Sequence, residues 1–435
     1  MLPPSEIAKF YPIDISALDN SQVDGQGNTR RVKLCFTDAA GVRWMRDQFG
    51  RLTELGSNLR ITTDRMRAKV FSQFNEDFLA TYGVTIDYKV DPDGYPQVNF
   101  VADVSGPGVT DALIAPHDWI GDLIAHDIIE PTVISADQRA AFPQWTLNAL
   151  ALGGRLYGIP MTIDTVALIR NTDLAPDAPP TLDDLIATAE NLRERRLVTD
   201  LFAVRVGEEG DPFQIWPLFA SAGGNLFHRM SEGGRDPSNI AIAAPESIAA
   251  FDQLRTLGEE GAGILRRSMD AKRSFELFDS RQTAFLITTS DGMLAAREAH
   301  IPFAVSAVPR FEGKKPAVPF RLVHGLFMAK QGKNKAVAHD LFADYLTQSR
   351  IMETLSRGIV CPVAVKDVAA TTDPGIRQYQ QLCNSAIAMP TFPQMEQVWR
   401  IVGRAQASVI AGAPAQQSAE NAAAEVAACF AENPT

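Results

Sequence analysis

The spacing of apolar residues along the first part of the chain predicts strands and helices in alternation. RVKLCFTD (31–38) predicts a first strand, and RMRAKVFSQFNEDFLATYG (65–83) has apolar residues at helical spacing and ends in a glycine. VTIDYKV (84–90) and the almost wholly apolar DALIA (111–115) predict two further strands, the second of the kind buried in a parallel sheet. This order is typical of βαβ units, with an inserted helix or loop of unassigned role at 41–64.

Two later stretches are extended for longer than a typical strand of ~5–6 residues. They are YGIPMTIDTVALIRN (157–171) and FRLVHGLFMAK (320–330). A strand that crosses between two lobes explains each of them. The remaining pattern predicts a helix capped by Thr181 after two prolines, strands at 283–289 and 302–311, an amphipathic helix pair at 334–357, and a helical C-terminus from 393 with a break at 412–414.

Length and charge narrow the possible classes of protein. At 435 residues the chain is long enough for two or three domains, or for two lobes built from a discontinuous chain. A net charge of -11 and a pI near 5.1 argue against nucleic acid or an anionic membrane surface as partner. No apolar run approaches the ~18 residues of a spanning helix. Residues 1–30 are polar and irregular, which predicts an extension or linker without the basic start and apolar centre of a signal peptide.

The four cysteines do not predict a metal site. Cys35, Cys361, Cys383 and Cys429 show no CxxC spacing and have no histidine close by in the sequence, which argues against zinc. Cys361 and Cys383 flank a short predicted helix, so a disulfide in an oxidising compartment and two free buried thiols are equally good interpretations. We expect no metal and no cofactor.

Carboxylates and aromatic rings recur in three segments that lie far apart in the sequence. Carbohydrate sites need this mixture, because carboxylates and amides bind hydroxyls while flat rings cover the apolar faces of a sugar. The segments are DALIAPHDWIGD at 111–122, GGRLYGIPMTIDTVALIRNTDL at 153–174, and MPTFPQMEQVW at 389–399.

The order of these elements resembles that of the extracellular solute-binding proteins of the maltose-binding type (family 1), the substrate receptors of ABC sugar importers. The resemblance covers about residues 31–430 and also rests on DPFQIWPLFASAGGNLF, SRQTAFLITT and VSAVPRFEGKKPAVPF. It implies an α/β, two-lobed periplasmic-binding-protein fold, with discontinuous lobes joined by crossing segments and a ligand cleft between them. The implied N-lobe is 31–162 plus 326–357, and the implied C-lobe is 167–322 plus 363–435. Function in such a fold is hinge closure around a ligand, without bond chemistry.

The resemblance also implies ligand-binding residues. Asp118 and Asp164 match family carboxylates, Phe213 and Trp399 match rings that lie against sugar faces, and Thr37 and Asp38 stand where a hydroxyl-binding group usually stands.

Two rings that the family often has are absent. Ala115 replaces a tryptophan at the end of the DALIA strand, and TTSDGM at 288–293 has none after the ITT strand. We therefore expect a shorter or more polar sugar than a long malto-oligosaccharide. The residues expected to supply replacement contacts are His117, Trp119, Asp291, Arg321 and His324.

Several of these residues have a purely structural alternative. Trp216 lies in an apolar helix segment, which favours core packing, and Trp399 has helical spacing with core positions. Asp118 could cap the helix that follows it. Asp164 stands in an apolar strand, and a buried carboxylate costs several kcal/mol unless paired, which favours a cleft-facing position.

The function expected from these features is that of a non-enzymatic receptor for a di- or trisaccharide. The expected partners are that small carbohydrate and the permease subunits of an ABC transporter, and we expect a monomer that binds no nucleic acid. Its expected location is extracytoplasmic, either periplasmic or as a lipid-anchored lipoprotein, with a leader that is absent from the printed sequence. The alternatives are a receptor of the same fold for a sugar phosphate or polyol phosphate, which needs converging basic residues, and a glycoside hydrolase with Asp118 and Asp164 as its carboxylate pair.

Overall fold

The structure is a computed structural model, and it divides into two compact units. Unit 1 comprises Met1–Ala115, Leu123–Met161 and Gly325–Leu355, and unit 2 comprises Pro116–Asp122, Thr162–His324 and Ser356–Thr435. The segment Pro116–Asp122 thus groups with unit 2, whereas the sequence placed it in the first lobe. The residues that the structure describes are 21–23, 29–31, 36–38, 40–46, 52–90, 101, 104, 110–229, 235–366, 373–390, 392 and 394–432.

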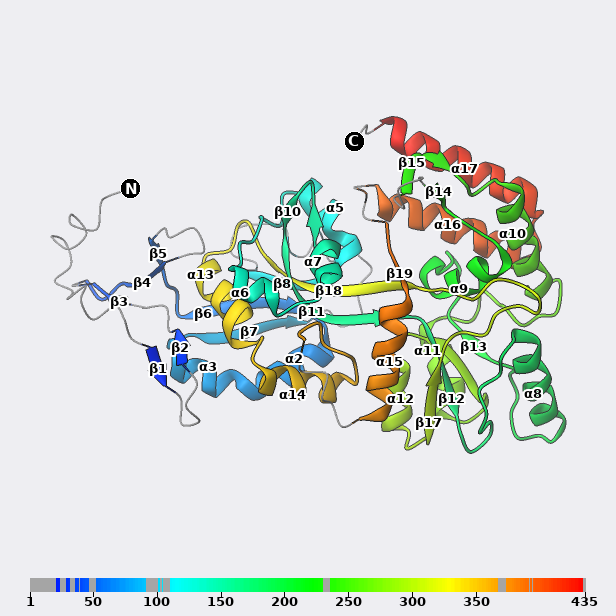
Figure 1. Cartoon of the computed structure of the whole chain (residues 1–435), viewed down its shortest axis with the longest axis horizontal. Helices are drawn as coiled ribbons and strands as arrows, with labels where there is room; N and C mark the ends of the chain where they lie inside the picture. The colour runs from blue at the N-terminus through cyan, green and yellow to red at the C-terminus, as the bar shows by residue number, and fades with distance from the viewer. Residues whose placement is uncertain are drawn as a thin grey trace. The chain divides into compact units, whose positions relative to one another are not determined.

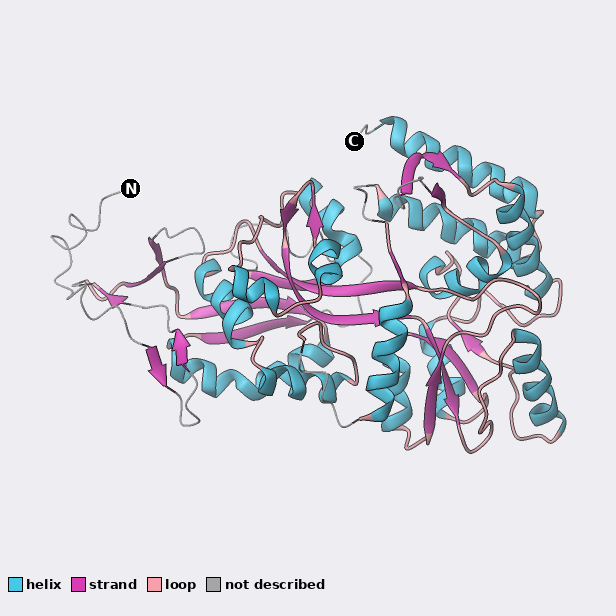
Figure 2. Cartoon of the chain, viewed as in Figure 1, coloured by secondary structure: helices cyan, strands magenta, loops and turns pink. Residues whose placement is uncertain are grey.

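Unit 1 contains most of a six-stranded sheet of order β11-β18-β8-β6-β7, to which β19 adds on β18 (Figure 1). β6 runs parallel to both β7 and β8, as expected for βαβ units. β11 and β18 lie within the two long extended stretches of the sequence, and Figure 2 shows both as long strands. The first residues of β11 and the last residues of β18 belong to unit 1, and the rest of each strand belongs to unit 2. The strands are β6 (Asn58–Thr63), β7 (Thr85–Val90), β8 (Ala112–Pro116), β11 (Gly158–Thr165), β18 (Phe320–Met328) and β19 (Ile387–Ala388).

The helices of unit 1 follow the predicted pattern with breaks. The helix expected over 65–83 is α2 (Arg65–Phe71), a 3-10 turn η2 (Ser72–Phe74) and α3 (Asn75–Tyr82). The Asp64 carboxylate accepts the Arg67 N–H at the start of α2, and Gly83 ends α3 in the left-handed conformation that glycine tolerates. The remaining helices are α6 (Ala136–Ala140), α7 (Gln144–Ala149), α13 (Lys335–Asp340) and η4 (Leu341–Tyr345), and two more, α5 (Ile120–Ala125) and α14 (Ser349–Ile359), belong partly to unit 1 and partly to unit 2.

The first strand of the main sheet is not the one that the sequence predicted. Among the described residues of 31–38, Phe36–Thr37 form a strand of a separate three-stranded sheet, β3-β4-β5, and Arg31 ends β2. The strand that precedes α2 is β6, within the segment 41–64 that we expected to be a helix or loop. Most of the extension expected at 1–30 lies outside the described residues. The short strands are β1 (Ser21–Val23), β2 (Thr29–Arg31), β3 (Phe36–Thr37), β4 (Arg43–Arg46), β5 (Leu52–Glu54), β9 (Ala151–Leu152) and β10 (Arg155–Leu156).

Unit 2 has a four-stranded sheet of order β13-β16-β12-β17. β12 is antiparallel to β16 and β17, and β13 is parallel to β16. The sequence expected a single extended stretch over 157–171, but Val166 separates β11 from β12 and the two strands belong to different sheets. The strands are β12 (Ala167–Asn171), β13 (Ala203–Val204), β16 (Phe285–Thr288) and β17 (Phe303–Ser306), with a hairpin of β14 (Phe227–Arg229) and β15 (Arg235–Ile240).

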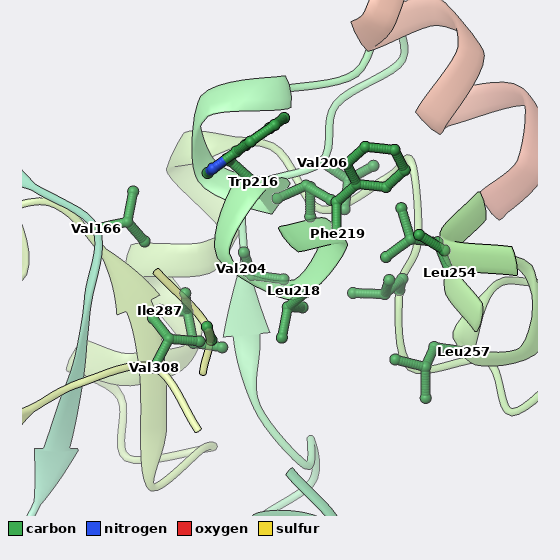
Figure 3. Packing of buried hydrophobic residues seen from close by; sticks show 14 of the residues in the cluster. Val166, Val204, Val206, Trp216, Leu218, Phe219, Leu254, Leu257, Ile287 and Val308 are labelled. Atoms are coloured by element: carbon green, nitrogen blue, oxygen red, sulfur yellow. The ribbon is translucent and has the colours of Figure 1, made fainter. Parts of the chain in front are cut away.

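The helices of unit 2 enclose its largest core. α9, α10, α16 and α17 contact one another, and Figure 1 shows them together in green, orange and red. Their buried side chains meet those of the sheet, as Figure 3 shows for Trp216, Phe219, Leu254 and Ile287. Each such side chain contributes about 1.5–3 kcal/mol by leaving water. The helices are α8 (Leu182–Glu194), α9 (Pro212–Ala222), α10 (Pro245–Leu257), α11 (Ala271–Asp279), α12 (Asp291–Glu298), α15 (Pro374–Ser385), α16 (Met395–Ile410) and α17 (Ala415–Glu432).

Gly210 allows the loop before α9 to approach the backbone of α16 closely. Its φ is +79, and a Cβ at this position would lie 2.0 Å from the Gly403 carbonyl oxygen. Gly207 has a similar φ of +74 but open space around it. We expect Gly207→Ala to lower the free energy of unfolding by about 1 kcal/mol, from backbone strain alone. Gly210→Ala should lower it by about 3 kcal/mol, because overpacking adds to that strain. Urea denaturation of both variants measures the difference, and equal losses would contradict the proposed close approach.

Candidate functional site

The candidate site lies in unit 2, where three distant segments of the chain meet. They are the 3-10 turn η3 (His117–Trp119), the start of β18 and the start of α16. The backbone N–H of Val323 donates to His117 Nδ1 at 3.2 Å, which joins η3 to β18. η3 also contacts α16 directly. The first and third segments singled out in the sequence are therefore neighbours in space.

His117 is an interior link rather than an exposed ligand contact. It is only 2% exposed. Burial, with a smaller contribution from the charge of Arg321, lowers the pKa of His117 to about 4. The ring is therefore neutral at physiological pH, as its role as hydrogen-bond acceptor requires.

Asp118 offers an acceptor that no protein group fills. Its Oδ1 is buried and accepts no hydrogen bond from another residue of the described part of the chain. Burial raises the pKa of Asp118 to about 6, against the opposing effect of its own backbone N–H. The alternative that Asp118 caps a helix is wrong, because η3 begins before it and its N-cap position is Pro116. Trp119, the next residue, is buried.

Glu396 on α16 is a neighbour of Asp118 that the sequence analysis did not single out. Burial and, after it, the nearby charges of Asp118 and Asp122 raise the pKa of Glu396 to about 7, and the charge of Arg400 opposes this shift. Arg400 Nε lies 3.6 Å from Glu396 Oε1. The signal that could have found Glu396 is its position three residues before Trp399, on the same helical face.

Trp399 combines packing with an unfilled donor. It is 8% exposed, and its ring meets Phe320 edge-on at 5.5 Å between centroids. Trp399 Nε1 is buried and has no hydrogen-bond partner among the described residues. On its other side Phe320 stacks on Trp216 at 4.3 Å, and Trp216 is buried in the core, as the sequence predicted.

Asp164 is engaged by the protein itself. It is 5% exposed, and its carboxylate accepts hydrogen bonds from Thr165 N at 2.8 Å, Ser290 N at 3.1 Å and Ser290 Oγ at 2.8 Å. The Tyr379 hydroxyl also donates to it. Burial raises the pKa of Asp164, and these donors oppose the shift. The premise that this carboxylate lacks partners in the protein is therefore wrong, and its role is to join β11 to α12 and α15.

Cys361 and Cys383 are buried thiols in the structure and are not joined as a disulfide. Cys361 Sγ donates to the Ile163 carbonyl at 3.3 Å. Burial raises the pKa of Cys383 well above its ordinary value, and the Asp164 charge adds to this effect. Of the two interpretations left open by the sequence, the structure has the buried thiols. Cys35 lies outside the described residues.

The two polar residues expected on β18 point to opposite faces of the strand. Side chains alternate along a strand, so His324 shares a face with Phe320 while Arg321 lies on the other. Burial lowers the pKa of the Arg321 guanidinium, which Cys383 opposes. His324 is thus on the face that carries Trp399, and Arg321 is on the face toward Cys383.

Phe213 and Asp291 lie elsewhere in unit 2. Phe213 is partly buried at the start of α9, where it packs on the core. Asp291 is exposed and opens α12, directly after the Ser290 that binds Asp164. α9 packs against α16, whereas α12 is joined to β11 by the hydrogen bond from Ser290 to Asp164.

Thr37 and Asp38 belong to the small sheet of unit 1. The Asp38 carboxylate accepts hydrogen bonds from Trp44 Nε1 and from the Ala40 and Val42 N–H groups, each at 2.9 Å. The Trp44 hydrogen bond, followed by that of Val42, lowers the pKa of Asp38. The carboxylate therefore closes the β3–β4 turn, and the sequence-based expectation that these residues follow the first strand of the main sheet is wrong.

The strand that precedes α2 is β6, and it ends in two hydroxyl-bearing residues that differ from Thr37. Thr62 and Thr63 are buried at the carboxyl end of β6, and neither Oγ1 has a hydrogen-bond partner in the described residues. Carboxyl ends of parallel strands are where ligands bind in open α/β sheets. These threonines were not predicted from the sequence, because the apolar pattern placed the first strand at 31–38.

Within the described residues there is no group of three or more His, Cys, Asp or Glu side chains placed to hold a metal ion. A search of the same residues finds no helix with the length and apolar character needed to cross a membrane.

Comparison with solved structures shows the class of fold. The maltotriose-binding protein of Thermus thermophilus, solved with maltotriose, matches with a TM-score of 0.76 and 21% identity. The match covers 86% of this chain and 100% of that one. The fold is therefore the α/β fold of the solute-binding proteins.

Sequence comparison gives the family. The sequence model of the bacterial extracellular solute-binding protein family matches residues 69–382, and the chain belongs to this family. The galactooligosaccharide-binding protein of Bacillus subtilis is 22% identical, over 86% of this chain and 89% of its own length. The maltotriose-binding protein of Pyrococcus abyssi is 24% identical, over 76% of this chain and 72% of its own length.

Proposed function

We propose that this protein is the carbohydrate receptor of an ABC importer, that it binds a neutral di- or trisaccharide outside the cytoplasm, and that it delivers the sugar to the permease. The observation that carries the proposal is the contact in unit 2 between η3, which bears Asp118, and α16, which bears Glu396 and Trp399. Asp118 Oδ1 is a buried acceptor without a donor, and Trp399 Nε1 is a buried donor without an acceptor among the described residues. A sugar hydroxyl can serve both groups, because it donates one hydrogen bond and accepts others.

The family and the relatives support the same class of ligand. The names of the two relatives described above, and that of the solved protein, refer to the binding of an oligosaccharide. Identities of 21–24% do not define which sugar this chain binds. The di- or trisaccharide is proposed because the sequence lacks two of the stacking rings that a long chain of sugars needs.

The charge of the site disfavours an anionic ligand. A phosphate needs converging cationic groups or a helix N-terminus. Asp118, Asp122 and Glu396 give this part of unit 2 a negative charge, and Arg400 offsets one of them. Arg321, which the sequence offered as a phosphate ligand, lies on the opposite face of β18 from Trp399.

A thermal-shift panel tests the proposal. The panel contains maltose, maltotriose, trehalose, sucrose, a galactooligosaccharide, a polyol, and glucose 6-phosphate. A ligand present at about 100 times its Kd should stabilise the fold by about 2.7 kcal/mol and raise the Tm. We expect a shift from a neutral oligosaccharide and recovery of that sugar intact by chromatography. A shift from glucose 6-phosphate alone, or hydrolysis of the sugar, would contradict the proposed receptor.

A further inference from the structure

Phe320, the first residue of β18, lies between two tryptophan rings. It is fully buried, and its ring stacks on Trp216 with 4.3 Å between centroids and 27° between planes. It meets Trp399 edge-on, at 5.5 Å and 71°. Trp216 in turn contacts Phe219 at 5.8 Å within the largest core of unit 2 (Figure 3). Phe320 thus joins the Trp399 ring to the rings of the packed interior.

The main chain of Phe320 is held by two other strands. The Thr165 hydroxyl, at the end of β11, donates to the Phe320 carbonyl at 2.8 Å. Ile387 of β19 pairs with Phe320, and its N–H donates to the Pro319 carbonyl at 3.0 Å. With its backbone bonded and its ring stacked, Phe320 is a fixed support.

Trp399 depends on such a support for its orientation. The torsion that turns an indole ring about its stem has broad energy minima, so neighbouring groups decide how the ring is inclined. A hydrogen bond from the indole N–H would restrict that torsion, but Trp399 Nε1 has no partner among the described residues. The edge-on contact with Phe320 therefore restricts the plane of the Trp399 ring.

The same strand also holds the other side of the proposed site. Three residues after Phe320, the Val323 N–H donates to His117 Nδ1 at 3.2 Å, and His117 directly precedes Asp118. Three residues of an extended strand span about 10 Å. The start of β18 thus sets where the ring of Trp399 lies relative to the segment that carries the Asp118 carboxylate.

We infer that Phe320 is a positioning residue of the proposed sugar site, and that its ring fixes the inclination of the Trp399 ring against which the apolar face of the sugar packs. This inference rests on the proposed function. A ring that is already held loses little conformational freedom when the sugar binds, whereas a ring free to turn must be ordered at the cost of affinity.

Replacing Phe320 by leucine tests this role, because the variant keeps an apolar side chain but removes the ring. We expect the affinity for the best neutral oligosaccharide of the panel, measured by calorimetry, to fall about three- to tenfold. Phe251→Leu is the matched control, since Phe251 is equally buried in the same core and its ring meets Phe219 at 4.8 Å. It should lower the Tm as well but change the affinity less than about twofold.

A double-mutant cycle separates positioning from a general loosening of the core. If Phe320 acts through Trp399, it has nothing left to position once that ring is gone. In the Trp399→Leu background, adding Phe320→Leu should therefore change the affinity less than about twofold. A purely structural effect would lower the affinity equally in both backgrounds.

Near-UV circular dichroism gives an independent measurement, because these bands require aromatic rings in fixed surroundings. Phe320→Leu should weaken the tryptophan bands of the sugar-free protein, and saturating sugar should restore part of the loss by ordering Trp399. Phe320→Met fills the space with an unbranched side chain and replaces Phe320→Leu if that variant does not fold.

Three results would overturn the inference while leaving the receptor function intact. They are wild-type affinity in a folded Phe320→Leu or Phe320→Met variant, an equal loss of affinity in the presence and absence of Trp399, and an equal loss in Phe251→Leu. Absence of binding by the wild type to every neutral sugar would instead overturn the proposed function, and the inference with it.

Discussion

Replacing Asp164 by alanine should lower the free energy of unfolding by about 3–5 kcal/mol, the largest loss that we expect from a polar substitution in this chain. The substitution removes the acceptor of the Thr165 N–H, of the Ser290 N–H and hydroxyl, and of the Tyr379 hydroxyl. Each donor then stays in an interior that water does not reach, and an unsatisfied buried donor costs about 1–3 kcal/mol. Urea denaturation followed by tryptophan fluorescence measures this loss, because Trp216 and Trp399 belong to unit 2, as Asp164 does.

Matched variants distinguish the network from the general effect of a lost side chain. Asp164→Asn retains one acceptor oxygen and should lose only about 1–2 kcal/mol. Tyr379→Phe removes one donor and should also lose about 1–2 kcal/mol. Glu194→Ala, at an exposed position on α8, should stay within about 0.5 kcal/mol of the wild type. If Asp164→Ala were as stable as Glu194→Ala, the network would contribute nothing, and the cleft-facing interpretation of Asp164 would regain support.

Replacing Asp118 by asparagine should weaken binding of the sugar found in the panel by about 10- to 100-fold at pH 6.5. The reason is that a hydrogen bond to a charged acceptor contributes about 1.5–3 kcal/mol, and the amide carries no charge. The fold should be retained, since Asp118 Oδ1 accepts no hydrogen bond from another described residue. Calorimetry measures the affinity, and the Tm without sugar reports the stability.

The control for this prediction is the exposed carboxylate of Asp291. The sequence offered it as a ligand residue, but in the structure it begins α12, directly after the Ser290 that binds Asp164, and not η3 or α16. We expect Asp291→Asn to change the affinity less than twofold. A large loss for Asp291→Asn, together with normal affinity for Asp118→Asn, would move the site from η3 to the start of α12.

Local sequence signals predicted the elements that depend on local rules. Helix caps such as Thr181 are set by hydrogen bonds between residues three apart, and the structure has this cap. The apolar runs that became β8 and β16 are equally local. The prediction failed at β6, because its pattern NLRITT mixes polar and apolar residues while the more apolar RVKLCFTD stands nearby.

Residue roles in the site depended on partners that sequence spacing does not reveal. Asp38 looked available to a ligand until Trp44 and a turn of backbone N–H groups were found to bind it. Asp164 looked unpaired because Ser290 and Tyr379 are 126 and 215 residues away along the chain. Glu396 was overlooked because its importance comes from Asp118 on another element.

The sequence by itself determined the class of fold, the family resemblance, and the residue types that could bind a sugar, because periodicity, capping and motif order are written along the chain. The tertiary structure alone decided which polar groups have hydrogen-bond partners within the described part of the protein and which have none. The hydrogen bonds that satisfy Asp164 and the contact that joins η3 to α16 form between distant segments only after packing. Burial then sets the charge state of Asp118 and Glu396, and burial is a property of the folded chain.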